Sequence, residues 1–136
     1  MRRVTVEGIY VADTPKGTCR YVSLVDERGY TLNMFVTTEH AANVSWVHAN
    51  KDIPKGAIAA VWFHQGIAEK LNLNLLRVCI DGLRDDYFVA HATYSRENSG
   101  ELSVAIQPSD GIVLSMLNGS DLFVDGRVEG MLVGKD

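Results

Sequence analysis

The sequence is poor in the features that mark secreted, membrane-spanning or metal-binding proteins. It holds two cysteines in 136 residues, Cys19 and Cys79, and neither has a second ligand at metal-binding spacing. Two isolated thiols predict buried, reduced cysteines in a cytoplasmic protein, with a disulfide as the open alternative. No apolar run reaches about 18 residues, so we expect no membrane span. The segment from Met1 to Val6 lacks the apolar stretch of a signal peptide and predicts a strand instead.

Basic runs and nucleotide-binding signatures are also absent. The formal net charge is −4, and no run of lysine and arginine occurs. Tight non-specific binding of nucleic acid usually requires a basic face. A nucleic-acid substrate would therefore need a basic patch built from distant residues, or a bound metal ion. The sequence has no Walker motif, no dinucleotide fingerprint and no nucleophile elbow.

Hydrophobic periodicity predicts two blocks of strands, each followed by helical sequence. The first block has strands at 3–12, 21–25 and 31–36, then helices at 38–49 and 57–71. The second has strands at 75–80, 87–94 and 102–106, a helix at 108–117 and a last strand at 122–124. Strands joined by hairpins favour an α+β fold with a mainly antiparallel, curved or barrel-like sheet and about three helices. We expect one domain over residues 1–125 and a Gly-rich C-terminal tail over 126–136.

Two segments of the second block resemble a known family. Residues 78–90 resemble its strand, turn and "phenylalanine, any, alanine" strand, and Gln107-Pro108-Ser109-Asp110-Gly111 resembles its "arginine-proline-serine-aspartate-alanine" signature before an apolar helix. Further similarity lies in 32–36, in Glu39 with Ala41, and in 122–124. The family is the bifunctional nuclease domain, and the resemblance spans nearly the whole chain.

The resemblance implies a compact, dimeric or larger homo-oligomeric domain that cleaves DNA or RNA. Phosphodiester hydrolysis needs an activated water and charge neutralisation, which carboxylates with Mg²⁺ or Mn²⁺ supply in many nucleases. We therefore expect Asp110, Glu39 and Ser109 at the catalytic site, and Asp110 with Asp81 as metal ligands. His40, His64 and His91 are candidate acid–base groups.

Each candidate also has a structural interpretation. Ser109 can cap the helix at 108–117, and Asp110 in its first turn complements the helix dipole. Glu39 suits the same role at the start of the helix at 38–49, and the pair Asp85-Asp86 is typical of a solvated hairpin turn. His91 stands between two alanines in a strand, which favours a surface or interface position.

The chain departs from the family pattern at several positions. Gln107 stands in place of arginine and Gly111 in place of alanine. Residues 53–62 also lack the family's arginine-proline and histidine-aspartate-leucine elements. These departures motivate a second hypothesis, a non-catalytic homo-oligomeric binding or regulatory module. Trp46 and Trp62 support an oligomer interface, because not every apolar residue of the two central helices can face one core.

Overall fold

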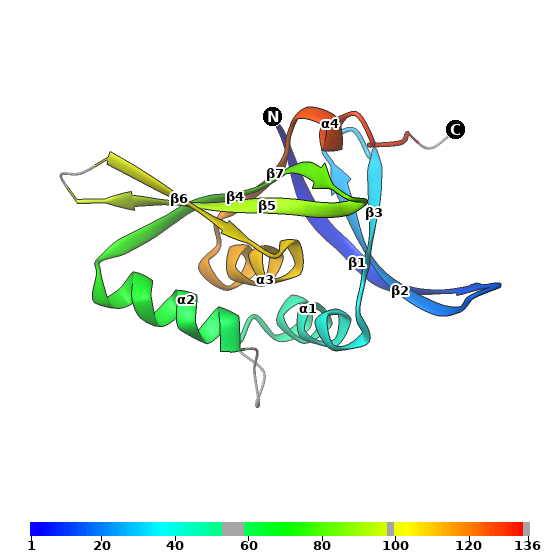
Figure 1. The fold of residues 1–136 in the computed structure, drawn as a ribbon, viewed down its shortest axis with the longest axis horizontal. Helices are drawn as coiled ribbons and strands as arrows, with labels where there is room; N and C mark the ends of the chain where they lie inside the picture. The colour runs from blue at the N-terminus through cyan, green and yellow to red at the C-terminus, as the bar shows by residue number, and fades with distance from the viewer. Residues whose placement is uncertain (53–58, 98–99, 135–136) are drawn as a thin grey trace.

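The computed structural model describes residues 1–52, 59–97 and 100–134 and shows one curved sheet with helices packed against it (Figure 1). The strands of the sheet are β1 Arg2–Thr14, β2 Gly17–Asp26, β3 Thr31–Val36, β4 Leu73–Arg84, β5 Tyr87–Arg96, β6 Gly100–Ile106 and β7 Asp121–Val124. The helices are α1 Thr38–Asn50, α2 Ala59–Lys70, α3 Pro108–Asn118 and the short α4 Gly126–Glu129.

The sheet has seven strands in the order β3-β2-β1-β7-β4-β5-β6. Neighbours pair antiparallel except for β4 and β7, which are parallel. Strands β3 and β6 end the order, so the sheet is open and has two edges. These observations confirm the predicted α+β class, the mainly antiparallel pairing and the three longer helices.

The hairpin between β4 and β5 is tighter than the sequence predicts. Asp85 and Asp86 have φ angles of 50° and 67°, which are the two left-handed conformations of a two-residue hairpin turn. Such a turn lets the strands pair as far as Arg84 and Tyr87. Asp81 therefore lies inside β4, not in the loop that follows a strand ending at residue 80.

The three longer helices lie on one side of the sheet (Figure 1). Every residue of α3 from Ser109 to Ser115 is buried. Gly111 permits this packing, because a Cβ atom at that position would lie 2.8 Å from Cγ1 of Val78 in β4. The core consists mainly of aliphatic side chains from both halves of the sheet, such as Leu24 and Ile80.

The start of α1 has a side-chain cap, whereas the start of α3 has none. The α1 helix is capped by Thr37, whose hydroxyl accepts a hydrogen bond of 3.2 Å from the backbone N–H of His40. In α3, Gln107 occupies the cap position without a side-chain hydrogen bond, and Pro108 follows it. Ser109 is therefore inside the first turn and is not the cap of α3.

The residues expected to form a tail pack against the domain. Helix α4 lies at residues 126–129, and its Val128 is fully buried in the core. Val133 forms an isolated β-bridge with Thr31. The chain is thus ordered against β3 through this segment, up to residue 134 of the described part.

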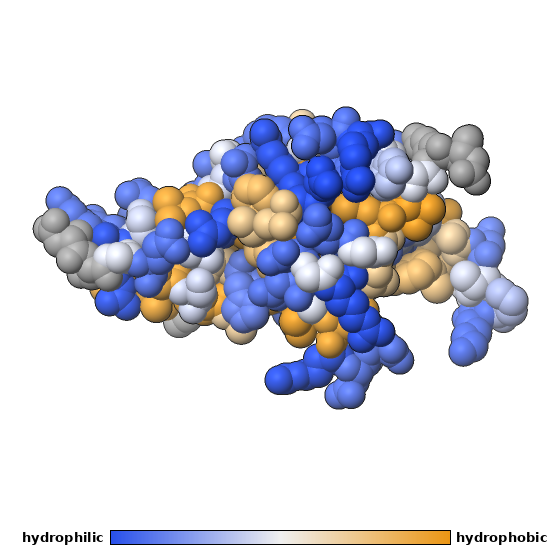
Figure 2. All heavy atoms as spheres, turned by 90° about the horizontal axis from the view of Figure 1, so that it is seen from above, coloured by the Kyte–Doolittle hydropathy of each residue, from blue (hydrophilic) through white to orange (hydrophobic). Residues whose placement is uncertain are grey.

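Both cysteines are free and half-buried. Burial, together with the nearby charge of Asp81, raises the pKa of the Cys79 thiol to about 11, so this thiol is protonated at neutral pH. No helix in the described ranges is both long and apolar enough to cross a membrane. On the side of the molecule that carries α4, apolar side chains gather in separate patches between hydrophilic ones (Figure 2).

Candidate functional site

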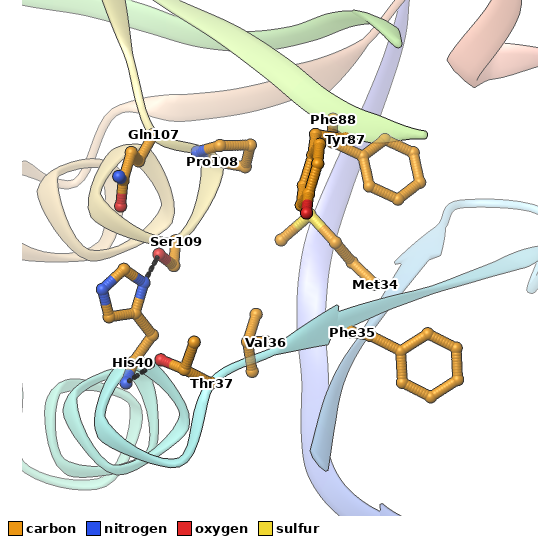
Figure 3. A pocket seen from close by; sticks show the side chains of 10 residues that line it. All are labelled: Met34, Phe35, Val36, Thr37, His40, Tyr87, Phe88, Gln107, Pro108 and Ser109. Carbon is orange, nitrogen blue, oxygen red and sulfur yellow. Dashed lines mark hydrogen bonds between the residues drawn. The ribbon is translucent and has the colours of Figure 1, made fainter. Parts of the chain in front are cut away.

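A solvent-open pocket lies beside the end of edge strand β3. Its volume is about 690 Å³. Its lining comes from the end of β3, the start of α1, the start of β5 and the start of α3 (Figure 3). The lining residues are Met34, Phe35, Val36, Thr37, His40, Tyr87, Phe88, Gln107, Pro108 and Ser109.

His40 and Ser109 meet at this pocket. Oγ of Ser109 lies 2.5 Å from Nδ1 of His40, although the two residues are 69 positions apart in the sequence. Each comes from the first turn of a helix, so the positive ends of the α1 and α3 dipoles are directed at the same place. The contact holds the imidazole ring through its Nδ1.

Asp110 lies next to this pair as a buried acid. Its side chain belongs to a residue that is only 4% exposed, and its Oδ1 has no hydrogen-bond partner among the described residues. Burial raises the pKa of Asp110, while the charges of His40 and His64 act in the opposite direction. The site therefore combines a histidine held by a hydrogen bond with a carboxyl group whose protonated form is favoured by burial.

The sequence-predicted site residues are only partly brought together. Ser109 and Asp110 lie beside His40, but Glu39 is exposed on the first turn of α1 and does not line the pocket. Asp81 lies elsewhere, with its Oδ2 2.8 Å from Nδ1 of His91. Since Ala90 and Ala92 point into the core, His91 and Asp81 lie on the opposite face of the sheet from α3.

The described side chains do not form a metal cage by themselves. Within those residues no group of three or more histidine, cysteine, aspartate or glutamate side chains is close enough to hold an ion. Magnesium sites that use fewer carboxylates complete their shell with water and substrate phosphates. The expected Mg²⁺ or Mn²⁺ thus stays a prediction, and no chemical step below depends on it.

One cation and two aromatic rings near the pocket were not singled out in the sequence. Nη1 of Arg20 donates a hydrogen bond of 3.1 Å to Oγ1 of Thr38, which places the guanidinium at the start of α1. Phe35 and Tyr87 line the pocket and are 65% and 77% exposed. Strand alternation could have identified Phe35, because Leu32 and Met34 point into the core. Nothing in the local sequence marks Arg20 or Tyr87.

A comparison with known proteins tests the family resemblance seen in the sequence. The model of the bifunctional nuclease domain matches residues 22–130, from β2 to the residue after α4. The matched range contains every residue that lines the pocket. The search of curated proteins returned no match. Because the family model covers most of the chain and every residue that lines the pocket, the chain belongs to the bifunctional nuclease domain family.

Proposed function

We propose that the protein hydrolyses phosphodiester bonds of DNA or RNA in the pocket, with His40 as the general acid–base. The observation that carries the proposal is the contact between His40 and Ser109 at the pocket wall. Family membership supports the reaction class. Fold alone does not settle an activity, so the argument rests on these side chains.

His40 has the chemistry that hydrolysis requires. A water molecule attacks phosphorus, the bond to the leaving oxygen breaks, and the leaving oxygen takes up a proton. A neutral imidazole can accept the proton of the attacking water, and the imidazolium can then protonate the leaving oxygen. Ser109 is the positioning residue, because it holds Nδ1. When Asp110 is ionised, its charge stabilises the imidazolium form of His40.

Positive charge for the substrate phosphate comes from the start of α1. The guanidinium of Arg20 is held there by Thr38. The free N–H groups of the first turn of a 13-residue helix add the positive end of its dipole. Together they form a local cationic site on a chain whose net charge is −4.

The test is a cleavage assay with fluorescent DNA and RNA oligonucleotides and the purified full-length chain. His40→Ala should lower the rate by about 10²- to 10⁴-fold. His48→Ala is the matched control, since His48 lies on the last turn of the same helix and outside this pocket. Equal rates for both variants would sink the assignment of His40. Parallel reactions with Mg²⁺, Mn²⁺ and EDTA test the predicted metal requirement.

A second candidate function is a non-catalytic homo-oligomeric binding or regulatory module. It is favoured by the burial of Ser109 and Asp110, which are 5% and 4% exposed. Trp46 on α1 and Trp62 on α2 are 48% and 54% exposed, which supports an interface with a second copy. This candidate predicts a stable oligomer by light scattering and no turnover under any metal condition. Turnover that is lost in His40→Ala would rule it out.

A further inference from the structure

Three aromatic rings form a ladder across β1, β2 and β3. Tyr10 pairs in register with Tyr21, and Tyr21 pairs with Phe35, so all three side chains lie on one face. The ring centroids of Tyr10 and Tyr21 are 5.6 Å apart in a stacked arrangement. Those of Tyr21 and Phe35 are 6.0 Å apart and meet edge to face. Tyr10 is 43% exposed and Phe35 is 65% exposed, so both ends of the ladder face solvent.

A bulge in β1 sets the position of the first ring. The pairing of β1 with β2 shifts register between Val6 and Gly8. A Cβ atom at Gly8 would lie 3.0 Å from Oη of Tyr10, so the Tyr10 ring lies across the bare backbone of this glycine. The ring is therefore held between the strand and Tyr21. The stacked rings of Tyr10 and Tyr21 therefore hold the neighbouring Phe35 in place before a ligand arrives.

The ladder meets the pocket of His40 at one residue, Phe35. Phe35 belongs both to the ladder and to the pocket lining. Tyr87 lines the same pocket from β5 and is 77% exposed (Figure 3). Phe35 lies on the sheet face opposite Leu32 and Met34, and its ring points away from His40 (Figure 3). A ligand stacked on Phe35 and Tyr87 would therefore lie at the outer rim of the pocket.

We propose that the ladder and Tyr87 bind an unpaired nucleic-acid strand, and that the protein therefore selects single-stranded substrates. This inference rests on the proposed function for the reaction that follows binding. Bases of a single strand can stack on aromatic side chains, whereas the bases of a duplex are stacked on each other. Exposed rings at the rim of the pocket, with the guanidinium of Arg20 at the start of α1, offer contacts to bases and to a phosphate.

The charge of the chain favours the same occupant and binding mode. Duplex-binding proteins neutralise many phosphates and lose affinity steeply with salt. Here the net charge is −4, and Arg20 is bonded to Thr38, the residue that follows the pocket residue Thr37. Stacking must then carry the affinity. For a single strand the salt slope is about −0.7 per neutralised phosphate, so we expect a slope no steeper than about −1 to −2.

The experiment measures binding apart from cleavage. All variants are made in the His40→Ala background, and fluorescence anisotropy follows a labelled 12-nucleotide oligothymidine or the same strand in a duplex. Phe35→Leu keeps apolar bulk but removes a ring, and it should weaken single-strand binding by about 5- to 100-fold. Tyr87→Ala should have a similar effect. Trp62→Ala removes an exposed ring from α2, outside the ladder, and should leave binding unchanged. Thermal melting confirms that each variant is folded.

The outcomes separate this inference from the proposed function. Single-strand preference that disappears in Phe35→Leu and Tyr87→Ala supports the ladder, even if the wild-type chain hydrolyses nothing. Hydrolysis by the wild-type chain with equal affinity for both oligonucleotides overturns the ladder and leaves the nuclease proposal standing. The ladder is also overturned if Phe35→Leu changes the mass found by light scattering without changing strand binding, because a second copy would then occupy this face.

Discussion

Asp110 and Asp26 are buried carboxyl groups whose pKa values shift in opposite directions. Burial raises the pKa of Asp110, and the nearby charges of His40 and His64 only partly oppose it. Burial acts the same way on Asp26, but hydrogen bonds from Arg28 and from the backbone N–H of Tyr30 bring its pKa below the usual value. The two groups therefore contribute opposite pH dependences to stability.

Asp110→Asn tests the first of these shifts. In the folded chain Asp110 stays protonated to a higher pH than in the unfolded chain, so the folded state binds more protons above about pH 4. Its contribution to the free energy of unfolding therefore falls as pH rises through the raised pKa. We expect the asparagine variant to gain stability relative to wild type between pH 4 and 7, measured by urea unfolding. A constant difference across this range would contradict the raised pKa.

Asp26→Asn should show the reverse behaviour. A depressed pKa adds stability above the unfolded value, and this stability is lost as pH falls through the folded pKa. The asparagine variant should therefore be less stable than wild type at pH 7, and the difference should shrink towards pH 3. The same urea titrations measure both variants, so each serves as the control for the other.

Ser109→Ala tests the positioning role of the serine hydroxyl. Loss of one hydrogen bond to the imidazole is expected to lower the hydrolysis rate by about 5- to 10-fold, a smaller effect than removal of His40. The pH–rate profile should shift as well, because the hydroxyl contacts the titrating ring. A lower rate with an unchanged profile would indicate a structural role alone.

The sequence predicts the residues of the site better than their partners. The motif at 107–111 identifies Ser109 and Asp110, but the capping role expected for Ser109 is wrong, because Gln107 occupies the cap position of α3. The partner of Ser109 is His40, 69 positions away, and no local pattern reports a contact at that distance. Asp81 was expected to bind a metal together with Asp110, but its place in β4 directs its side chain to His91 instead.

At the scale of the elements, α2 and α3 differ in how closely they pack. A Cβ atom at Gly111 of α3 would meet Cγ1 of Val78 at 2.8 Å. A Cβ atom at Gly66 of α2 would have no neighbour among the described residues within 4 Å. The same substitution should therefore have opposite effects on the two helices.

Gly111→Ala should destabilise the fold by about 1–3 kcal/mol, because the buried, β-branched Val78 has little freedom to move. Gly66→Ala should stabilise it by about 0.5–1 kcal/mol through helix propensity. Denaturant unfolding measures both. The double variant Val78→Ala with Gly111→Ala should lose less free energy of unfolding than the two single variants lose together. Strict additivity would show that the two positions are not in steric contact.

Local patterns are sufficient for most of the elements. Alternation and helical spacing predict the strands and the three longer helices, because each depends on neighbours a few residues away. The turn at Asp85-Asp86 is predicted for the same reason. The cap of α3 is not predicted by local pattern. Pro108 is the first residue of the helix, so the cap position falls on Gln107 and not on Ser109.

At the scale of the whole molecule, strand order could not be predicted from periodicity. The last strand in the sequence, β7, lies at the centre of the sheet between β1 and β4. Its pairing depends on contacts between residues more than a hundred positions apart, such as Val4 with Leu122. The packing of α4 against the core is a further long-range feature. From composition alone we expected the residues of α4 to belong to a Gly-rich tail.

Val128→Ala tests whether α4 is part of the stable fold. Val128 is fully buried, and removal of two methyl groups should lower the free energy of unfolding by about 2 kcal/mol. Val133→Ala is the matched control, because Val133 is 66% exposed and contacts Thr31 through its backbone. Equal stabilities for the two variants would mean that α4 frays in solution.

The central position of β7 also has a consequence for how the chain folds. The meander of β1, β2 and β3 and the meander of β4, β5 and β6 each involve pairing between neighbours in sequence. Until β7 pairs with both, the facing edges of β1 and β4 have no partner. Unpaired edges promote association between chains, and long-range pairing is slow. Refolding should therefore lose yield as protein concentration rises, with closure of the sheet by β7 as the late step.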